Sequence, residues 1–232
     1  MGELKSNGSR AKRAILWIWI VLVADMLDGT SSYMSYCLLQ AVSNGVDVPD
    51  AVINADNTRE TIVGIFSFLI HIISIITFIM WFRRAYYNLH QSVSHRLAHS
   101  EGWAAGCWFV PILNLYRPYK IMKELYQETK AFLSQRGMDM NLSLTTHLLG
   151  WWWALWIIGG IFDLITTQMT LRAETLDEMM TSSIMFMVSC AMTVPLAFIT
   201  VKIIKDYSKA ETLLADVQGL NTENQCSAGT VC

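Results

Sequence analysis

Four apolar segments, each long enough to cross a lipid bilayer, constrain this chain more than any other feature. A helix needs about 20 mostly apolar residues to span the hydrocarbon core. The sequence supplies them at about residues 14–39, 61–82, 148–171 and 181–204. A backbone in lipid satisfies its polar groups only as a helix or a closed barrel, and these segments lack the alternating pattern of barrel strands. The sequence therefore predicts an all-α integral membrane fold.

The basic residues alternate across these segments in the way that membrane topology requires. Of the 17 lysines and arginines, 15 lie before the first segment, between the second and third, or at the end of the fourth. The other two, Arg59 and Arg172, lie in the remaining loops, which carry seven acidic residues. Because cytoplasmic loops retain basic residues, we expect both termini and the central loop to be cytoplasmic, in a multi-pass protein of a bacterial inner membrane.

This pattern predicts a simple division of the chain. Residues 1–13 form a cytoplasmic tail, and residues 14–205 form one four-span membrane domain with a cytoplasmic insert at 83–146. Residues 206–232 form a flexible cytoplasmic tail. The first apolar run is longer than the apolar region of a signal peptide, which has roughly 7–15 residues. We therefore expect this segment to be retained.

The insert contains two unusual stretches. Residues 103–116 are apolar but too short to span, and Pro111 interrupts any single helix, which is typical of an interfacial or re-entrant segment. From Ile121 to Leu133 the apolar residues have helical spacing, opposite a basic face. This amphipathic helix either lies on the anionic inner leaflet or packs on the base of the protein itself.

Two motifs in the insert resemble a known family. They are WFRRAYYNL at 81–89 and GWAAGCWFVPILNLYRPYK at 102–120, and the tryptophan-rich stretch at 150–160 is similar too. The likeness covers about residues 65–205 and is to bacterial multi-pass membrane proteins that are classified only as a domain of unknown function. The resemblance implies a four-helix membrane domain and no established reaction.

Residues of these motifs form a predicted cytoplasmic surface for contact with the membrane interface or a protein partner. They are Arg83, Arg84, Trp103, Trp108, Phe109, Pro111, Asn114, Tyr116, Arg117 and Pro118.

Ionisable side chains inside the predicted spans are a second candidate site. Asp25, Asp28, His71 and Asp163 lie on three spans at similar depths, roughly 15–20 Å from the inner boundary at 1.5 Å per residue. Because charged groups in lipid are costly, such residues point to function. The cluster either binds a cation or relays protons, or it joins helices through hydrogen bonds. A shift of the first span would instead bring Asp28 to the outer water.

Other functional classes find little support in the sequence. It has no phosphate-binding glycine loop, GxSxG or HExxH motif, or paired metal cysteines. The five cysteines show no disulfide framework, and His95 and His99 have zinc-like spacing without further ligands. Since the basic residues follow the membrane pattern, we expect no nucleic-acid partner. We also expect no cofactor and no metal.

These patterns leave three functional hypotheses. The favoured one is a non-enzymatic membrane anchor or accessory component that recruits a partner through its cytoplasmic loop. The second is a small oligomeric channel or an ion- or proton-handling protein that uses the aspartate–histidine cluster. The third is an intramembrane enzyme.

Overall fold

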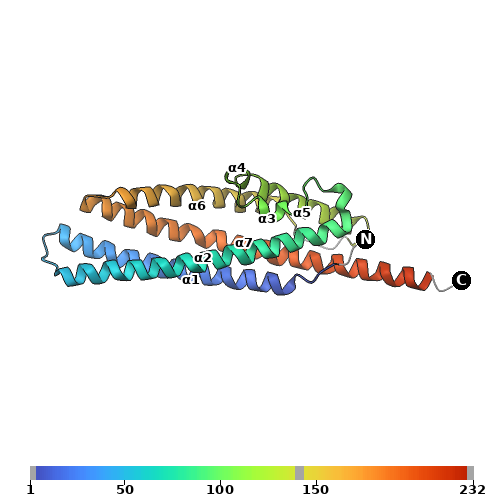
Figure 1. The fold of residues 1–232 in the computed structure, drawn as a ribbon, viewed down its shortest axis with the longest axis horizontal. Coiled ribbons are helices and arrows are strands. Elements are labelled where there is room, and N and C mark those ends of the chain that lie inside the picture. The colour runs from blue at the N-terminus through green and yellow to red at the C-terminus, as the bar shows by residue number, and fades with distance from the viewer. Residues whose placement is uncertain (1–3, 139–143, 229–232) are drawn as a thin grey trace. The chain divides into compact units, whose positions relative to one another are not determined.

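Seven α-helices form the described part of a computed structural model, which covers residues 4–138 and 144–228 and contains no strand there. Four of them are long: α1 (Gly8–Ser43), α2 (Asp50–Val93), α6 (Thr146–Arg172) and α7 (Leu176–Ala228) (Figure 1). All four are long and apolar enough to cross a membrane. Each encloses one of the four predicted spans, so the all-α, four-span prediction is confirmed.

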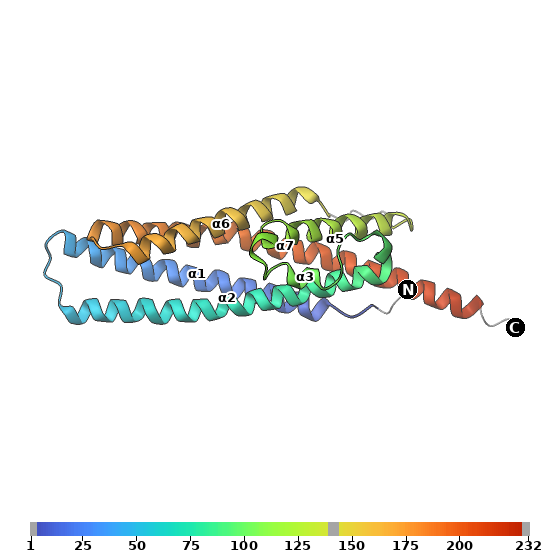
Figure 2. The same cartoon turned by 45° about the horizontal axis from the view of Figure 1, so that its top comes forward.

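The insert is helical as well. After a short 3-10 turn at Ser94–Arg96 come the one-turn helices α3 (Trp103–Gly106) and α4 (Pro111–Asn114), and then α5 (Arg117–Ser134) (Figure 2). The prolines act as helix starts, since Pro111 and Pro118 each lie in the first turn of a helix, where no backbone donor is needed. The chain leaves α5 at Gly137, whose φ of 72° is a left-handed conformation that favours glycine.

The chain divides into two compact units, where the sequence predicts one membrane domain. The span unit comprises residues 16–76 and 152–200. The terminal unit comprises the described residues of 1–15, 77–151 and 201–232.

Lipid-facing side chains dominate the surface of the span unit. On α2 the exposed apolar residues include Ile65, Phe66 and Phe68, at 57%, 68% and 65% exposure. Such exposure is costly in water and normal in hydrocarbon. Polar contacts instead join its helices: Trp152 Nε1 donates to Thr200 Oγ1 (3.1 Å), linking α6 to α7. The span unit is thus apolar outside and polar at selected helix contacts.

The terminal unit has a conventional buried core. The predicted apolar face of α5 is buried, including Ile121, Leu125 and Tyr126. Tyr126 also donates to the carbonyl of Ile203 on α7 (2.9 Å). Burial raises the pKa of the Tyr126 phenol, so the hydroxyl remains a donor. The amphipathic helix therefore packs its apolar face on the protein, and its basic face stays outside.

The last part of α7 includes residues that the sequence assigns to a cytoplasmic tail. Residues 206–228 continue the helix. Tyr207, Ala210 and Leu214 are buried in the terminal unit. From residue 207 to residue 217, every third or fourth residue is buried, a pattern that a polar overall composition hides.

Candidate functional site

Asp25 and His71 form an acid–base pair inside the span unit. Asp25 Oδ1 on α1 lies 3.3 Å from His71 Nε2 on α2. The other ring nitrogen, His71 Nδ1, lies 2.9 Å from the carbonyl oxygen of Ser67. Because a carbonyl only accepts, Nδ1 carries a proton and donates it. Nε2 is therefore the nitrogen that can exchange a proton with Asp25.

A cavity of about 380 Å³ adjoins this pair. Its walls come from α1, α2, α6 and α7 and are mostly apolar, as in many binding pockets. Its polar lining residues are Asp25, His71, Ser74, Asp163, Ser189, Thr193 and Thr200. The cavity is large enough to hold water or a small ion beside two carboxylates.

Asp25 is only partly satisfied by the protein. Its side chain is 6% exposed, and Oδ2 is buried with no hydrogen-bond partner among the described residues. Thr193 lines the same cavity but donates its hydroxyl to the carbonyl of Cys190 (2.8 Å). Buried carboxylate oxygens without partners are rare because they are costly. Such an oxygen, on a residue that lines a cavity, is suited to bind a proton.

Asp163 lies on another wall of the cavity and is satisfied. Ser189 Oγ on α7 donates a hydrogen bond to Asp163 Oδ1 on α6. Asp28 is buried at 7% exposure, but it is not one of the residues that line the cavity. Of the four ionisable residues predicted to cluster, the structure therefore brings Asp25, His71 and Asp163 to one cavity and leaves Asp28 outside it.

The second predicted site, in the insert, is a mixture of buried and exposed side chains. Trp108 packs edge-on against Phe78 (5.7 Å between ring centroids), and Pro118 is buried. Phe109, by contrast, is 76% exposed. Tyr116 is 40% exposed, and the centroid of its ring lies 5.0 Å from Lys120 Nζ. The exposed part of this surface is therefore narrower than the motif.

The remaining motif residues have separate roles. Arg117 stacks on the Trp103 ring at 4.3 Å. Pro111 begins α4 and Asn114 ends it. Arg83 and Arg84 lie at a different pocket of the terminal unit. The residues of the predicted surface thus lie in several different local environments.

A buried polar network joins three distant parts of the terminal unit, and no sequence pattern indicated it. Asn7 and Asn88 both donate to the Glu211 carboxylate, at 3.0 Å to Oε2 and 2.6 Å to Oε1. Asn88 also pairs with the backbone of Lys5, at 3.0 and 2.8 Å. These residues have no fixed spacing in the sequence. Asn7 lies in a polar N-terminal segment, where an asparagine resembles an ordinary solvated residue.

No group of three or more histidine, cysteine or acidic side chains in the described residues could hold a metal ion. His99 uses its backbone carbonyl to accept bonds from Tyr86 Oη and His90 Nε2, both at 3.0 Å. The geometry of the described residues therefore offers no zinc site around His99.

Comparison with known proteins identifies the chain at the level of its family. A family described as a domain of unknown function (DUF4328) matches residues 44–209. The chain belongs to the DUF4328 family. No curated protein and no solved structure matches the chain.

The DUF4328 match confirms the predicted resemblance and divides the cavity residues. His71, Asp163 and Ser189 lie inside the matched region, and Asp25 and Asp28 lie before it. The Asp25–His71 pair therefore joins one residue of the DUF4328 region to one residue on the preceding helix.

Proposed function

We propose that this protein handles protons in the membrane through the Asp25–His71 pair. The observation that carries the proposal is a buried carboxylate with one oxygen 3.3 Å from an imidazole and the other without a partner, beside a cavity. One proton shared between Asp25 and His71 makes the site neutral, and its loss leaves a carboxylate. A charged carboxylate in lipid costs free energy, whereas the pair that shares a proton is neutral. A proton is therefore the ligand that this site favours.

The geometry favours a proton over a metal ion. A metal needs several converging ligands, which the described residues do not bring together. A proton needs only one acid–base pair. Asp163 and Ser189 line the same cavity and can orient water toward Asp25. Because the pair needs only to exchange a proton, a non-enzymatic role is part of the proposal.

Proton flux into vesicles tests this function. The full chain is reconstituted into liposomes that contain a pH-sensitive dye, and a potassium gradient with valinomycin drives proton entry. We expect flux above that of empty vesicles for the unaltered protein, and loss of flux in Asp25→Asn and in His71→Gln, since each removes one half of the pair.

Asp28→Asn is the matched control, because it removes a buried carboxylate from the same helix without altering the cavity lining. It should retain flux. Equal flux in all three variants, with normal yield and elution in detergent, would reject the proton-handling proposal.

A second candidate function is recruitment of a protein partner through the insert, with both termini and the insert in the cytoplasm. Its support is a group of exposed apolar side chains around α4: Phe109, Ile112 and Leu115 are 76%, 75% and 58% exposed. Apolar patches of this kind on a non-spanning segment mark interaction sites. Lys120 beside this patch adds positive charge, which suits an acidic partner.

Replacement of these side chains tests recruitment. Phe109→Ser with Ile112→Ser should abolish cross-linking to a specific cellular protein, while Leu164→Ser, at an equally exposed residue of α6, should not. If the Phe109→Ser/Ile112→Ser variant and the Leu164→Ser variant gave the same cross-linked products, this role would be excluded.

A further inference from the structure

A small basic pocket lies in the terminal unit, and none of its lining residues lines the acid–histidine cavity. Its volume is about 260 Å³. Its charged and aromatic lining residues are Lys5, Arg10, Arg83, Arg84, Tyr87 and Glu101. These residues come from the N-terminal segment, α1, α2 and the loop before α3. Four cations thus face one carboxylate, which leaves an excess of positive charge in one pocket.

The acidic lining of the pocket does not balance this charge. Glu101 is the one acidic lining residue, and its Oε1 lies 3.8 Å from Arg83 Nη2, at the limit of an ion pair. Both side chains are well exposed, so the interaction contributes little. Arg10 uses one Nη1 proton on the Met80 carbonyl at 3.4 Å. Most guanidinium donors of the pocket are therefore available to an anion.

The pocket is held in place by contacts around it. Lys5 Nζ and Arg84 Cζ lie 5.0 and 5.5 Å from the centroid of the Tyr87 ring. Asn88 clamps the Lys5 backbone by two hydrogen bonds and is itself bonded to Glu211. A site whose side chains are ordered before binding loses less entropy on binding.

We propose that this pocket binds the phosphate group of an anionic phospholipid. Guanidinium groups present planar paired donors that match phosphate oxygens, and a lysine adds a point charge. The volume is below the roughly 300–1,000 Å³ of pockets for drug-sized ligands, which suits a headgroup. Arg83 and Arg84 directly follow the predicted second span at 61–82, and Arg10 lies four residues before the first. A phosphate at a membrane surface is therefore within reach.

Retention of lipid by the purified protein tests the proposal. The full chain is exposed to phosphatidylglycerol or phosphatidylcholine in detergent, and bound lipid is measured by native mass spectrometry and by titration. We expect saturable binding of phosphatidylglycerol but not phosphatidylcholine. Arg10→Gln with Arg84→Gln should weaken that binding by about tenfold or more, since each change removes a charged hydrogen-bond donor to the phosphate.

Lys12→Gln with Arg13→Gln is the matched control. It removes the same charge from residues that do not line the pocket, so it should retain binding. If the arginine pair proves necessary for folding, Lys5→Gln at an exposed side chain provides the same test with a smaller expected loss.

Two results would overturn the proposal. Equal loss of phosphatidylglycerol in the pocket and control variants would indicate general surface electrostatics only. Saturable binding of inorganic phosphate without retention of phosphatidylglycerol would assign the pocket to a soluble anion. Because proton flux depends on other residues, failure here leaves the proton-handling proposal unaffected.

Discussion

Individual side chains in this protein acquire their chemistry from what lies next to them. The Ser67 carbonyl accepts a hydrogen bond from His71 Nδ1, and this contact leaves Nε2 facing Asp25. Asp25 and Asp28 lie three residues apart on α1, yet only Asp25 lines the cavity. Of these two aspartates, only Asp25 is therefore placed to exchange a proton with a group in the cavity.

Cys107 shows the opposite case, a reactive group made inert. It is fully buried in the terminal unit, and burial raises the pKa of its thiol to about 11. Because the thiolate is the nucleophile, we expect slow alkylation by iodoacetamide at pH 8. The rate should increase as the pH rises toward 11, where the thiolate becomes a major species.

Peptide mass spectrometry at several pH values measures this rate. The same chain in denaturant is the control, because the thiol there returns to its usual pKa and is accessible. Equal rates in the folded and denatured chain would show that Cys107 is not buried.

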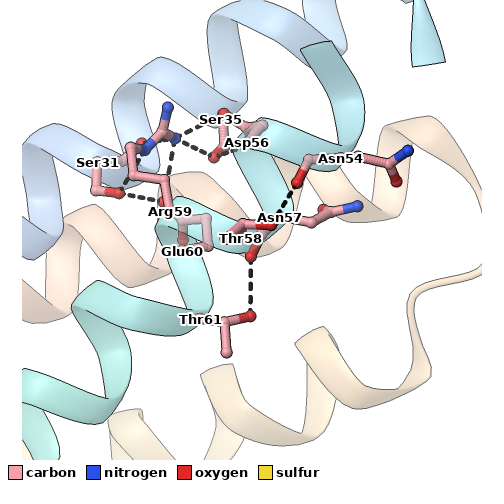
Figure 3. Close-up of polar contacts among 9 residues, drawn as sticks. All are labelled: Ser31, Ser35, Asn54, Asp56, Asn57, Thr58, Arg59, Glu60 and Thr61. Carbon is pink, nitrogen blue, oxygen red and sulfur yellow. Dashed lines mark hydrogen bonds and ion pairs between the residues drawn. The ribbon is translucent and has the colours of Figure 1, made fainter. Parts of the chain in front are cut away.

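Pairs of helices are joined by a few polar networks in otherwise apolar surroundings. The clearest is at one end of the span unit, where Arg59 on α2 contacts α1 (Figure 3). Its guanidinium donates to Ser31 Oγ, Ser31 O and Ser35 Oγ, at 3.0, 3.0 and 2.8 Å. Asp56, 2.7 Å away, balances its charge. This accounts for one of only two basic residues outside the predicted cytoplasmic regions.

Arg59→Gln should therefore loosen the contact between α1 and α2. The change removes a charged donor from two serines and leaves Asp56 without its ion pair, so we expect a loss of about 1–3 kcal/mol. Unfolding in detergent, followed by tryptophan fluorescence, measures the change.

Arg172→Gln is the control, since Arg172 is the other arginine of these loops and is exposed at the end of α6. Its stability should change by less than about 0.5 kcal/mol. A similar change in both variants would mean that the network contributes nothing specific.

The predicted membrane topology of the whole chain depends on the distribution of its basic residues. The residues that the structure describes contain four helices long and apolar enough to cross a membrane. The side to which each loop faces remains a prediction from charge. We expect a cysteine introduced at Asp47 to react with an impermeant maleimide added outside intact cells, and one at Lys120 to be protected.

This experiment uses a background without the five native cysteines. Both introduced cysteines should react after the cells are opened, which controls for access. Labelling of position 120 but not position 47 from outside would invert the topology and place the basic pocket on the other side of the membrane.

Sequence alone was enough to predict the four spanning helices and the helical face from Ile121 to Leu133. Both depend on hydrophobicity within short windows, which tertiary contacts only reinforce. The packing of residues 207–217 of α7 has no comparably clear signal in the sequence, because its buried positions are scattered among polar ones.

Tertiary structure decided which polar groups meet. Asn7 and Glu211 are 204 residues apart and form one buried hydrogen-bonded pair. Ser189 reaches Asp163 from a different helix, and Lys5 and Arg10 share a pocket with Arg83 and Arg84. No local pattern encodes such meetings, because they depend on how helices rotate and pack. Local hydrophobicity therefore determined the helices, and long-range packing determined the sites.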